Sequence, residues 1–132
     1  MKVLISDPIS DKGIEILRKE FDVDISTGLE PSQLIKKIGN YEALIVRSET
    51  QVTKEVINAG KQLKIIGRAG VGVDNIDVNA ATEKGIIVVN APEGNTISAA
   101  EHTIAMMMAL SRNIPQAYGS LKSRKWDRKK FT

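Results

Sequence analysis

The chain has 132 residues, of which 42% are hydrophobic and 27% are charged, and its net charge is +3. This length suits one domain of about 100–150 residues with its own core, and the composition argues against a disordered protein. The absence of cysteine excludes disulfides and thiolate metal sites, and the single His102 excludes a site built from two histidines of this chain. We therefore expect no metal site.

The positive charge is concentrated near the end of the sequence. Residues 113–132 carry six basic side chains and one acidic side chain, a net charge of +5, so residues 1–112 carry −2. A nucleic-acid-binding function would depend on this basic segment alone, and the acidic remainder argues against it. The N-terminal apolar run is only three residues long, and no apolar run approaches the ~20 residues of a membrane span. We expect no signal peptide, no membrane partner and a cytoplasmic location.

Five short apolar runs recur at intervals of 20 to 22 residues. They are residues 2–5, 22–25, 43–46, 64–67 and 86–89. Near-continuous runs of Val and Ile are typical of strands that are buried on both faces of a parallel sheet, whereas the alternating run 22–25 (DVDI) favours an edge strand.

Signals for helices lie between these runs. Ser10, Thr53 and Asp77 are candidate N-caps, Pro31 suits a first helical position, and Gly39, Gly60 and Gly85 suit helix ends. Alternating strands and helices predict right-handed crossovers with helices on both faces of the sheet. We predict an α/β fold, a flavodoxin-like doubly wound parallel five-stranded sheet, in a first domain of residues 1–97.

The pattern changes after residue 97. Ser98 and Glu101 form a Ser-x-x-Glu capping box, and the helix that follows as far as Leu110 is apolar on nearly every side. A second, more polar helix begins at Pro115. Because an apolar helix needs cover on every side, we expect residues 98–132 to be a crossover helix and an arm of a longer protein. Exposed apolar surface also predicts association between copies of the chain.

Candidate binding residues follow three of the predicted strands. In doubly wound sheets, ligands bind at the carboxyl ends of the strands. Arg47 and Ser48 follow the third run, Arg68 and the glycine-rich residues 67–75 come at the end of the fourth and after it, and residues 90–96 follow the fifth. A strand order of 2-1-3-4-5 would make these loops neighbours and would predict a site for a small anion with one or two acidic groups. Alternatively, the arginines pair with surface acids and the glycines only form a turn.

Two motifs lack the pattern that a catalytic or cofactor site requires. Gly67, Gly70 and Gly72 read G-x-x-G-x-G, the reverse of the dinucleotide fingerprint, and no G-x-G-x-x-G occurs in the chain. We therefore expect no cofactor pyrophosphate site here. Adjacent residues on a helix point in different directions, so His102 beside Glu101 is better interpreted as a structural histidine in a helix interface.

Two other classes of function stay open. A stand-alone flavodoxin-like anion-binding or regulatory module, such as a phosphate receiver, would carry acids after its first and third strands. Asp7 fits the first position, but Arg47 occupies the other. In a nucleic-acid binder, Trp126 among basic residues could stack on a base, although a solvated arm or a subunit contact suits a single aromatic residue better.

The sequence resembles the D-2-hydroxyacid dehydrogenases, and among them the branch that acts on phosphoglycerate. The matching motifs are residues 46–48 (VRS), 66–77 (IGRAGVGVDNID), 90–96 (NAPEGNT), 98–103 (SAAEHT) and 126–131 (WDRKKF), in family order and with family-like spacing. The glycine-rich loop and the RKKF arm are more specific for that branch than the AEHT helix.

The resemblance implies a substrate domain followed by a Rossmann domain that binds NAD, and oxidation of 3-phospho-D-glycerate at its 2-hydroxyl in serine biosynthesis. It implies that Arg47, Ser48, Arg68, Gly70, Gly72 and Asn95 bind substrate, that Val71 lies near the nicotinamide, and that Trp126 and Arg128 reach a neighbouring subunit of a homo-oligomer. The family's cofactor fingerprint and its catalytic Arg, Glu and His lie further along the sequence. We therefore expect no catalytic residue in this chain and no hydride transfer by it alone.

Overall fold

The computed structural model describes residues 1–131. The chain divides into two compact units, Met1–Gly94 and Asn95–Thr132, which we call unit 1 and unit 2. Unit 1 contains the sheet, and unit 2 is helical. The predicted domain boundary after residue 97 stays a prediction.

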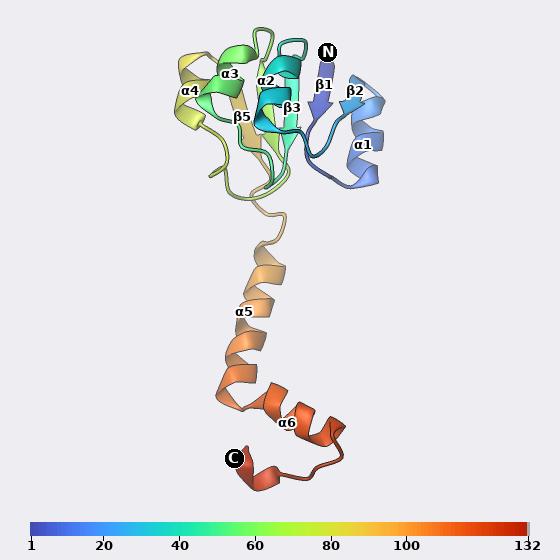
Figure 1. Ribbon diagram of the computed structural model, residues 1–132, viewed down its shortest axis with the longest axis vertical. Helices are drawn as coiled ribbons and strands as arrows, with labels where there is room; N and C mark the ends of the chain where they lie inside the picture. Colours follow the sequence, from blue (N-terminus) through green and yellow to red (C-terminus); the bar gives the residue numbers. More distant parts are fainter. Residues whose placement is uncertain (132) are drawn as a thin grey trace. The chain divides into compact units, whose positions relative to one another are not determined.

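Five parallel strands form the sheet of unit 1 (Figure 1). They are β1 (Lys2–Ile5), β2 (Asp22–Ile25), β3 (Ala43–Val46), β4 (Ile65–Arg68) and β5 (Ile87–Asn90), in the order β2-β1-β3-β4-β5. The predicted fold class and strand order are confirmed. β4 and β5 each begin one residue later than predicted, because the ladder between them starts where Ile65 pairs with Ile87.

Four helices connect these strands. They are α1 (Asp11–Arg18), α2 (Pro31–Ile38), α3 (Lys54–Ala59) and α4 (Val78–Glu83). The Ser10 hydroxyl accepts a hydrogen bond from a backbone N–H of α1, and the Asp77 carboxylate accepts one from a backbone N–H of α4, so both caps are confirmed. Thr53 stands at the N-cap position of α3 but makes no capping hydrogen bond with its side chain.

The main core lies between the sheet and three of the helices. Leu44 and Ile66 from the central strands pack with Ile38 of α2 and Ile57 of α3, and all four are fully buried. Burial of each such side chain contributes roughly 1.5–3 kcal/mol. α1 buries no residue and takes no part in this core. Right-handed crossovers place α1 on the opposite face of the sheet from α2, α3 and α4.

β5 differs from the prediction, because it is not buried on both faces. Ile87 is 61% exposed and Val89 is 44% exposed, and only Val88 packs against the core. Successive side chains of a strand point to opposite faces of the sheet, so Val88 faces the core while Ile87 and Val89 face the side of α1. Within unit 1, α1 packs on β2, at the other edge of the sheet, and leaves these two residues uncovered. β2 is the other outer strand, as its alternating sequence predicted.

Unit 2 consists of α5 (Thr96–Ser111), α6 (Ile114–Lys122) and a short 3₁₀ helix, η1 (Arg128–Lys130). The capping box predicted at Ser98 is wrong. Asn95 occupies the N-cap position, and the Ser98 hydroxyl donates to the Asn95 carbonyl oxygen from inside the first turn. Asn113 joins α5 to α6 in a left-handed conformation with φ of 50°, which asparagine tolerates better than most residues.

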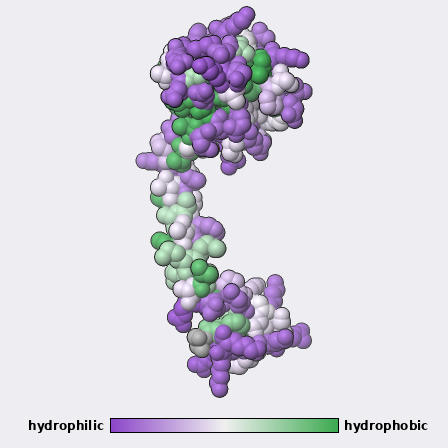
Figure 2. All heavy atoms as spheres, turned by 60° about the vertical axis from the view of Figure 1, so that its left-hand side comes forward, coloured by the Kyte–Doolittle hydropathy of each residue, from purple (hydrophilic) through white to green (hydrophobic). Residues whose placement is uncertain are grey.

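α5 exposes most of its apolar side chains. Figure 2 shows hydrophobic residues along this helix, and none of its residues is buried. Ile97, Ile104, Met107 and Leu110 are each more than half exposed. Among the described residues, no helix combines the length and the apolar character needed to cross a membrane.

Candidate anion-binding site

A buried carboxylate holds the loop that follows β3. Asp7, just after β1, is 1% exposed and accepts hydrogen bonds from the backbone N–H groups of Arg47 at 2.6 Å, Glu49 at 3.2 Å and Thr50 at 3.1 Å. The Thr50 hydroxyl also donates to it. Charge-assisted hydrogen bonds of this kind are stronger than neutral ones. Asp7 therefore anchors the Arg47 loop. A phosphate receiver needs an acid that is accessible to its phosphodonor, and the buried Asp7 does not meet this requirement.

Arg47 and Ser48 are exposed at the carboxyl end of β3. The backbone of Arg47 is fixed through its N–H and its carbonyl oxygen, which both take part in hydrogen bonds. Its guanidinium makes no hydrogen bond or ion pair with any residue that the structure describes. The alternative of a surface acid paired with Arg47 therefore finds no support in residues 1–131. An unpaired guanidinium offers five N–H donors and a permanent positive charge to an anion.

Arg68, at the end of β4, is held by the scaffold, and its side chain is only 13% exposed. Its Nε–H donates to the Arg47 carbonyl oxygen at 3.1 Å and to Oδ1 of Asn75 at 3.0 Å. Its Nη2 lies 3.9 Å from the carboxylate of Asp74, which is 85% exposed, and an exposed pair of this length is weak. The terminal nitrogens Nη1 and Nη2 thus carry the donors that remain for a ligand.

Gly70 and Gly72 leave space that the side chains of Arg68 and Asp74 occupy. A Cβ at Gly70 would lie 2.5 Å from Nη1 of Arg68, and one at Gly72 would lie 2.7 Å from Oδ1 of Asp74. Neither glycine has a positive φ, so the turn itself does not require them. The Gly70 N–H donates to the Arg68 carbonyl oxygen at 2.9 Å and is not free for a ligand. The guanidinium packs against glycine backbone, an arrangement that a larger residue would obstruct.

The loop after β5 is tied to the glycine-rich loop. The Asn90 amide donates to the Val71 carbonyl oxygen at 2.6 Å, and the Ala91 N–H donates to the Gly70 carbonyl oxygen at 2.9 Å. The Val71 side chain is 39% exposed. The three loops are therefore neighbours, as the strand order predicted. We call residues 47–50, 68–75 and 90–91 the arginine rim.

Asn75 joins the first two loops of the arginine rim, and sequence reasoning missed it. It is 5% exposed; its Nδ2 donates to the carbonyl oxygens of Arg47 at 3.1 Å and Thr50 at 2.7 Å, and its Oδ1 accepts from Arg68. The sequence placed Asn75 in the glycine-rich loop 67–75 but assigned it no role of its own. No local signal could reveal its partners, which lie up to 28 residues away.

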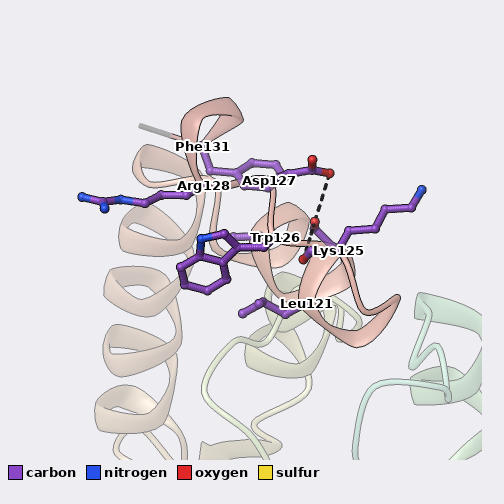
Figure 3. Close-up of a pocket in the computed structure, with 8 residues that line it drawn as sticks. Leu121, Lys125, Trp126, Asp127, Arg128 and Phe131 are labelled. Atoms are coloured by element: carbon purple, nitrogen blue, oxygen red, sulfur yellow. Dashed lines mark hydrogen bonds between the residues drawn. The ribbon is translucent and has the colours of Figure 1, made fainter.

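The other predicted site residues lie in unit 2, and their roles stay predictions. Asn95 is the N-cap residue of α5. Trp126 is 78% exposed and, with Arg128, Leu121 and Phe131, lines a pocket of about 250 Å³ (Figure 3). The Ser120 hydroxyl, which hydrogen-bonds to the Asp127 carboxylate at 3.2 Å, closes the turn beside this pocket.

Two further features bear on catalysis. His102 is exposed on α5, so the helix interface expected around it stays a prediction. Within the described part of the chain, no group of three or more His, Cys, Asp and Glu side chains could hold a metal ion.

Known proteins resemble this chain in sequence. Residues 3–125 match the family described as D-isomer specific 2-hydroxyacid dehydrogenase, catalytic domain. A D-3-phosphoglycerate dehydrogenase from Archaeoglobus fulgidus is 60% identical over 132 residues, which cover 99% of this chain and 25% of the relative. One from Synechocystis sp. is 60% identical over 130 residues, which cover 98% of this chain and 24% of the relative.

A solved structure shares the fold. The crystal structure of NAD+-bound 3-phosphoglycerate dehydrogenase from Entamoeba histolytica matches with a TM-score of 0.72 and 32% identity, over 83% of this chain and 38% of that one. The present chain spans about a quarter of the length of the curated relatives. Because the family match extends over nearly all of its residues, the chain belongs to the D-isomer specific 2-hydroxyacid dehydrogenase family.

Proposed function

We propose that this chain is the substrate-binding part of a D-3-phosphoglycerate dehydrogenase, and that its arginine rim binds the acidic groups of 3-phospho-D-glycerate. The whole enzyme would oxidise the 2-hydroxyl of that substrate with NAD, as the entry step of serine biosynthesis. Two relatives of that name, each 60% identical to this chain, support the choice of substrate.

The observation that carries the proposal is that two arginines with differently held side chains lie on neighbouring loops of the arginine rim. Arg47 has an exposed guanidinium on a fixed backbone, and Arg68 has a fixed guanidinium with two terminal nitrogens to offer. A ligand with a carboxylate and a phosphate can engage both cations. Each charge-assisted hydrogen bond contributes about 1.5–3 kcal/mol.

The arginine rim supplies one side of a cleft rather than a closed site. The pocket beside Arg47, lined also by Asp7, Pro8, Ser48 and Glu49, has a volume of only about 40 Å³. This is too small to enclose a phosphorylated three-carbon acid. We propose that the opposite wall comes from the part of the enzyme that corresponds to the remaining length of the relatives. Ser48 and Gly72 complete the proposed substrate contacts of unit 1, and Gly70 contributes by leaving room for the Arg68 guanidinium. The substrate contact expected of Asn95, in unit 2, stays a separate prediction.

The residues of unit 1 do not fit a whole dinucleotide. In nucleotide-binding sheets, the pyrophosphate lies after the first strand, on a glycine-rich turn and a helix N-terminus. Here the buried carboxylate of Asp7 follows β1, and its negative charge would repel a pyrophosphate. We therefore assign NAD mainly to the rest of the enzyme and limit this chain's contact with it to Val71.

We also propose that the basic arm makes a subunit contact in a homo-oligomer. Trp126 is exposed on unit 2, and Arg128 belongs to the most basic segment of the chain. Both side chains suit a neighbouring subunit whose surface is acidic or carries the bound anion. The cytoplasmic location expected from the sequence belongs to this proposal as well.

An NMR titration tests the binding function. At low salt, 3-phosphoglycerate should cause saturable shifts of the backbone amides of residues 67–73, and Arg47→Ala should abolish them. D-lactate, which lacks the phosphate, should bind at least tenfold more weakly. An absence of shifts with millimolar 3-phosphoglycerate would overturn binding by this chain.

A second assay concerns hydride transfer. The 132-residue chain mixed with NAD and 3-phosphoglycerate should give no increase in absorbance from NADH. A measurable rate from the pure chain, abolished by Arg47→Ala, would contradict the assignment of the cofactor and the catalytic residues to the rest of the enzyme.

A further inference from the structure

We infer that Asn75 is the positioning residue of the substrate site: its side-chain amide fixes the Arg68 guanidinium and the Arg47 loop relative to one another. The inference rests on the proposed function, because it concerns how the two arginines are presented to an anion. Asn75 itself is 5% exposed, so it acts through the arginines and need not touch the substrate.

Three hydrogen bonds use the polar atoms of the Asn75 side chain. Its Nδ2 donates to the carbonyl oxygens of Arg47 at 3.1 Å and Thr50 at 2.7 Å, and its Oδ1 accepts the Nε–H of Arg68 at 3.0 Å. One small side chain therefore bridges the loops that follow β3 and β4. Among the described residues, no other side chain is hydrogen-bonded to both arginines.

The backbone of Asn75 provides a fixed base for this bridge. Its carbonyl oxygen accepts the Val52 N–H at 2.8 Å, and the Asp77 N–H donates to the Val52 carbonyl oxygen at 2.9 Å. These bonds form an isolated parallel bridge between Val52 and Ile76. Val52 is 1% exposed and belongs to the core. The side-chain amide therefore extends from a backbone segment that is hydrogen-bonded to the core of unit 1.

The chemistry at this position requires an amide. Two carbonyl oxygens need donors and one guanidinium needs an acceptor, which only an amide supplies in one short side chain. An aspartate would keep the acceptor for Arg68 but would turn a negative oxygen toward the carbonyl oxygens of Arg47 and Thr50. It would also neutralise the positive charge that the site offers to an anion.

Asp74, the neighbour of Asn75, is the group toward which the Arg68 guanidinium could turn if the Asn75 amide were removed. The exposed carboxylate of Asp74 lies 3.9 Å from Nη2 of Arg68 and competes for the terminal nitrogens. Asn75 holds the guanidinium through Nε, with a bond of 3.0 Å that is shorter than the approach of Asp74. Without the amide, Arg68 keeps only its bond to the Arg47 carbonyl oxygen and can turn toward Asp74.

The experiment compares Asn75→Ala and Asn75→Asp with Asn58→Ala, in which an exposed asparagine of α3 is removed as a matched control. The first measurement is the ¹⁵N NMR signal of the Arg68 Nε–H in the ligand-free chain of 132 residues. We expect a shifted, slowly exchanging signal in the wild type and in Asn75→Asp, and its loss in Asn75→Ala. The second measurement is the Kd for 3-phosphoglycerate, which both variants should raise about tenfold or more. Asn58→Ala should change neither.

The two measurements separate this inference from the proposed function. If Arg47→Ala and Arg68→Ala weaken binding while Asn75→Ala and Asn75→Asp do not, the positioning role is overturned and the proposed function stands. If the wild-type chain binds no 3-phosphoglycerate, the proposed function fails, and the Nε–H signal still decides the role of Asn75. If Asn75→Ala does not fold, Asn75→Asp decides alone: wild-type affinity in that variant overturns the inference.

Discussion

The Nε–H of Arg68 donates to the backbone carbonyl oxygen of Arg47 at 3.1 Å, so the two arginines that follow neighbouring strands are joined by a hydrogen bond. They are therefore not equivalent cations. Arg68 divides its guanidinium between holding the loop and offering two nitrogens to a ligand, whereas the Arg47 guanidinium has no structural task within residues 1–131. Substitution of Arg47 should therefore change ligand affinity alone, whereas substitution of Arg68 should change both ligand affinity and the free energy of unfolding.

Arg47→Ala should reduce affinity for 3-phosphoglycerate at least tenfold and leave the free energy of unfolding within about 0.5 kcal/mol of wild type, because its side chain is exposed. Arg68→Ala should reduce affinity as much and also cost about 1–3 kcal/mol, because it leaves Oδ1 of Asn75 without its donor. Urea unfolding and ligand titration on the same samples check both values. An equal loss of stability in the two variants would contradict the division of roles.

Asp7→Asn should destabilise the chain by about 2–3 kcal/mol. The buried carboxylate accepts three backbone N–H groups, and an amide would turn a donor toward at least one of them. Asp11→Asn, an exposed position in the first turn of α1, is the control and should cost less than about 1 kcal/mol. Hydrogen exchange at Arg47, Glu49 and Thr50 should accelerate in Asp7→Asn; unchanged protection there would argue against the anchor.

Gly70→Ala should displace the Arg68 guanidinium, because the new Cβ would lie 2.5 Å from Nη1. The contact is with the end of a flexible side chain, so we expect a loss of stability of about 1–2 kcal/mol together with a larger, at least tenfold, loss of affinity. Gly13→Ala in α1 meets only ordinary contacts of 3.4 Å and beyond, and should preserve affinity. Equal affinities for the two variants would show that Arg68 does not depend on the glycine.

The stability of the chain should decline at alkaline pH because of Tyr41. Burial, together with its hydrogen bond to Asp24, raises the pKa of Tyr41 to about 12. A hydroxyl whose pKa is higher in the folded chain stabilises it fully below pH ~10, and this contribution is lost as the pH rises toward 12. Tyr41→Phe should remove a decline of about 1 kcal/mol between pH 9.5 and pH 11.5 in urea unfolding.

The same pair predicts a second, acidic effect. The hydrogen bond from Tyr41 and the neighbouring Lys37 lower the pKa of Asp24. A carboxyl whose pKa is lower in the folded chain contributes stability above pH ~4 and loses it as the pH falls further. Asp24→Asn should therefore flatten the pH dependence of stability below pH 4; an unchanged slope would contradict the pairing.

The apolar surface of α5 should cause copies of this chain to associate. Leu110 is 80% exposed and Ile97 is 75% exposed, and such surface is normally covered. Sedimentation velocity should show a mass above that of the monomer that increases with concentration, and Leu110→Lys should shift it toward the monomer. Ser123→Lys, which adds the same charge at an exposed polar position, is the control. A monomeric wild-type chain at all concentrations would contradict this expectation.

The sheet was predictable because its signals are local. Each strand is a short Val- and Ile-rich run, and the caps at Ser10 and Asp77 lie beside the helices that they begin. The exposure of β5 was not predictable from its composition, because Ile87 and Val89 are apolar although no helix of unit 1 packs on them. The prediction of an N-cap at Ser98 was wrong because a short capping-box pattern can occur inside a helix. Asn95, three positions earlier, also suits an N-cap and is the residue at which α5 begins.

The residues of the candidate site that carry local signals were predictable, and those that depend on distant partners were not. Arg47 and Arg68 could be found because each follows a strand directly, and the strand order then makes them neighbours. Asp7 follows a strand as well, but its role depends on backbone N–H groups about 40 residues away. Asn75 belongs to a loop and acts on partners in two other segments, so no spacing in the sequence points to it.

The position of Ser48 has a practical consequence. It is exposed beside the Arg47 guanidinium, in a chain that contains no cysteine. Ser48→Cys would therefore give the 132-residue chain a single thiol at the edge of the arginine rim. A solvent-sensitive fluorophore attached there would turn the chain into an optical reporter of anion binding that needs neither cofactor nor turnover.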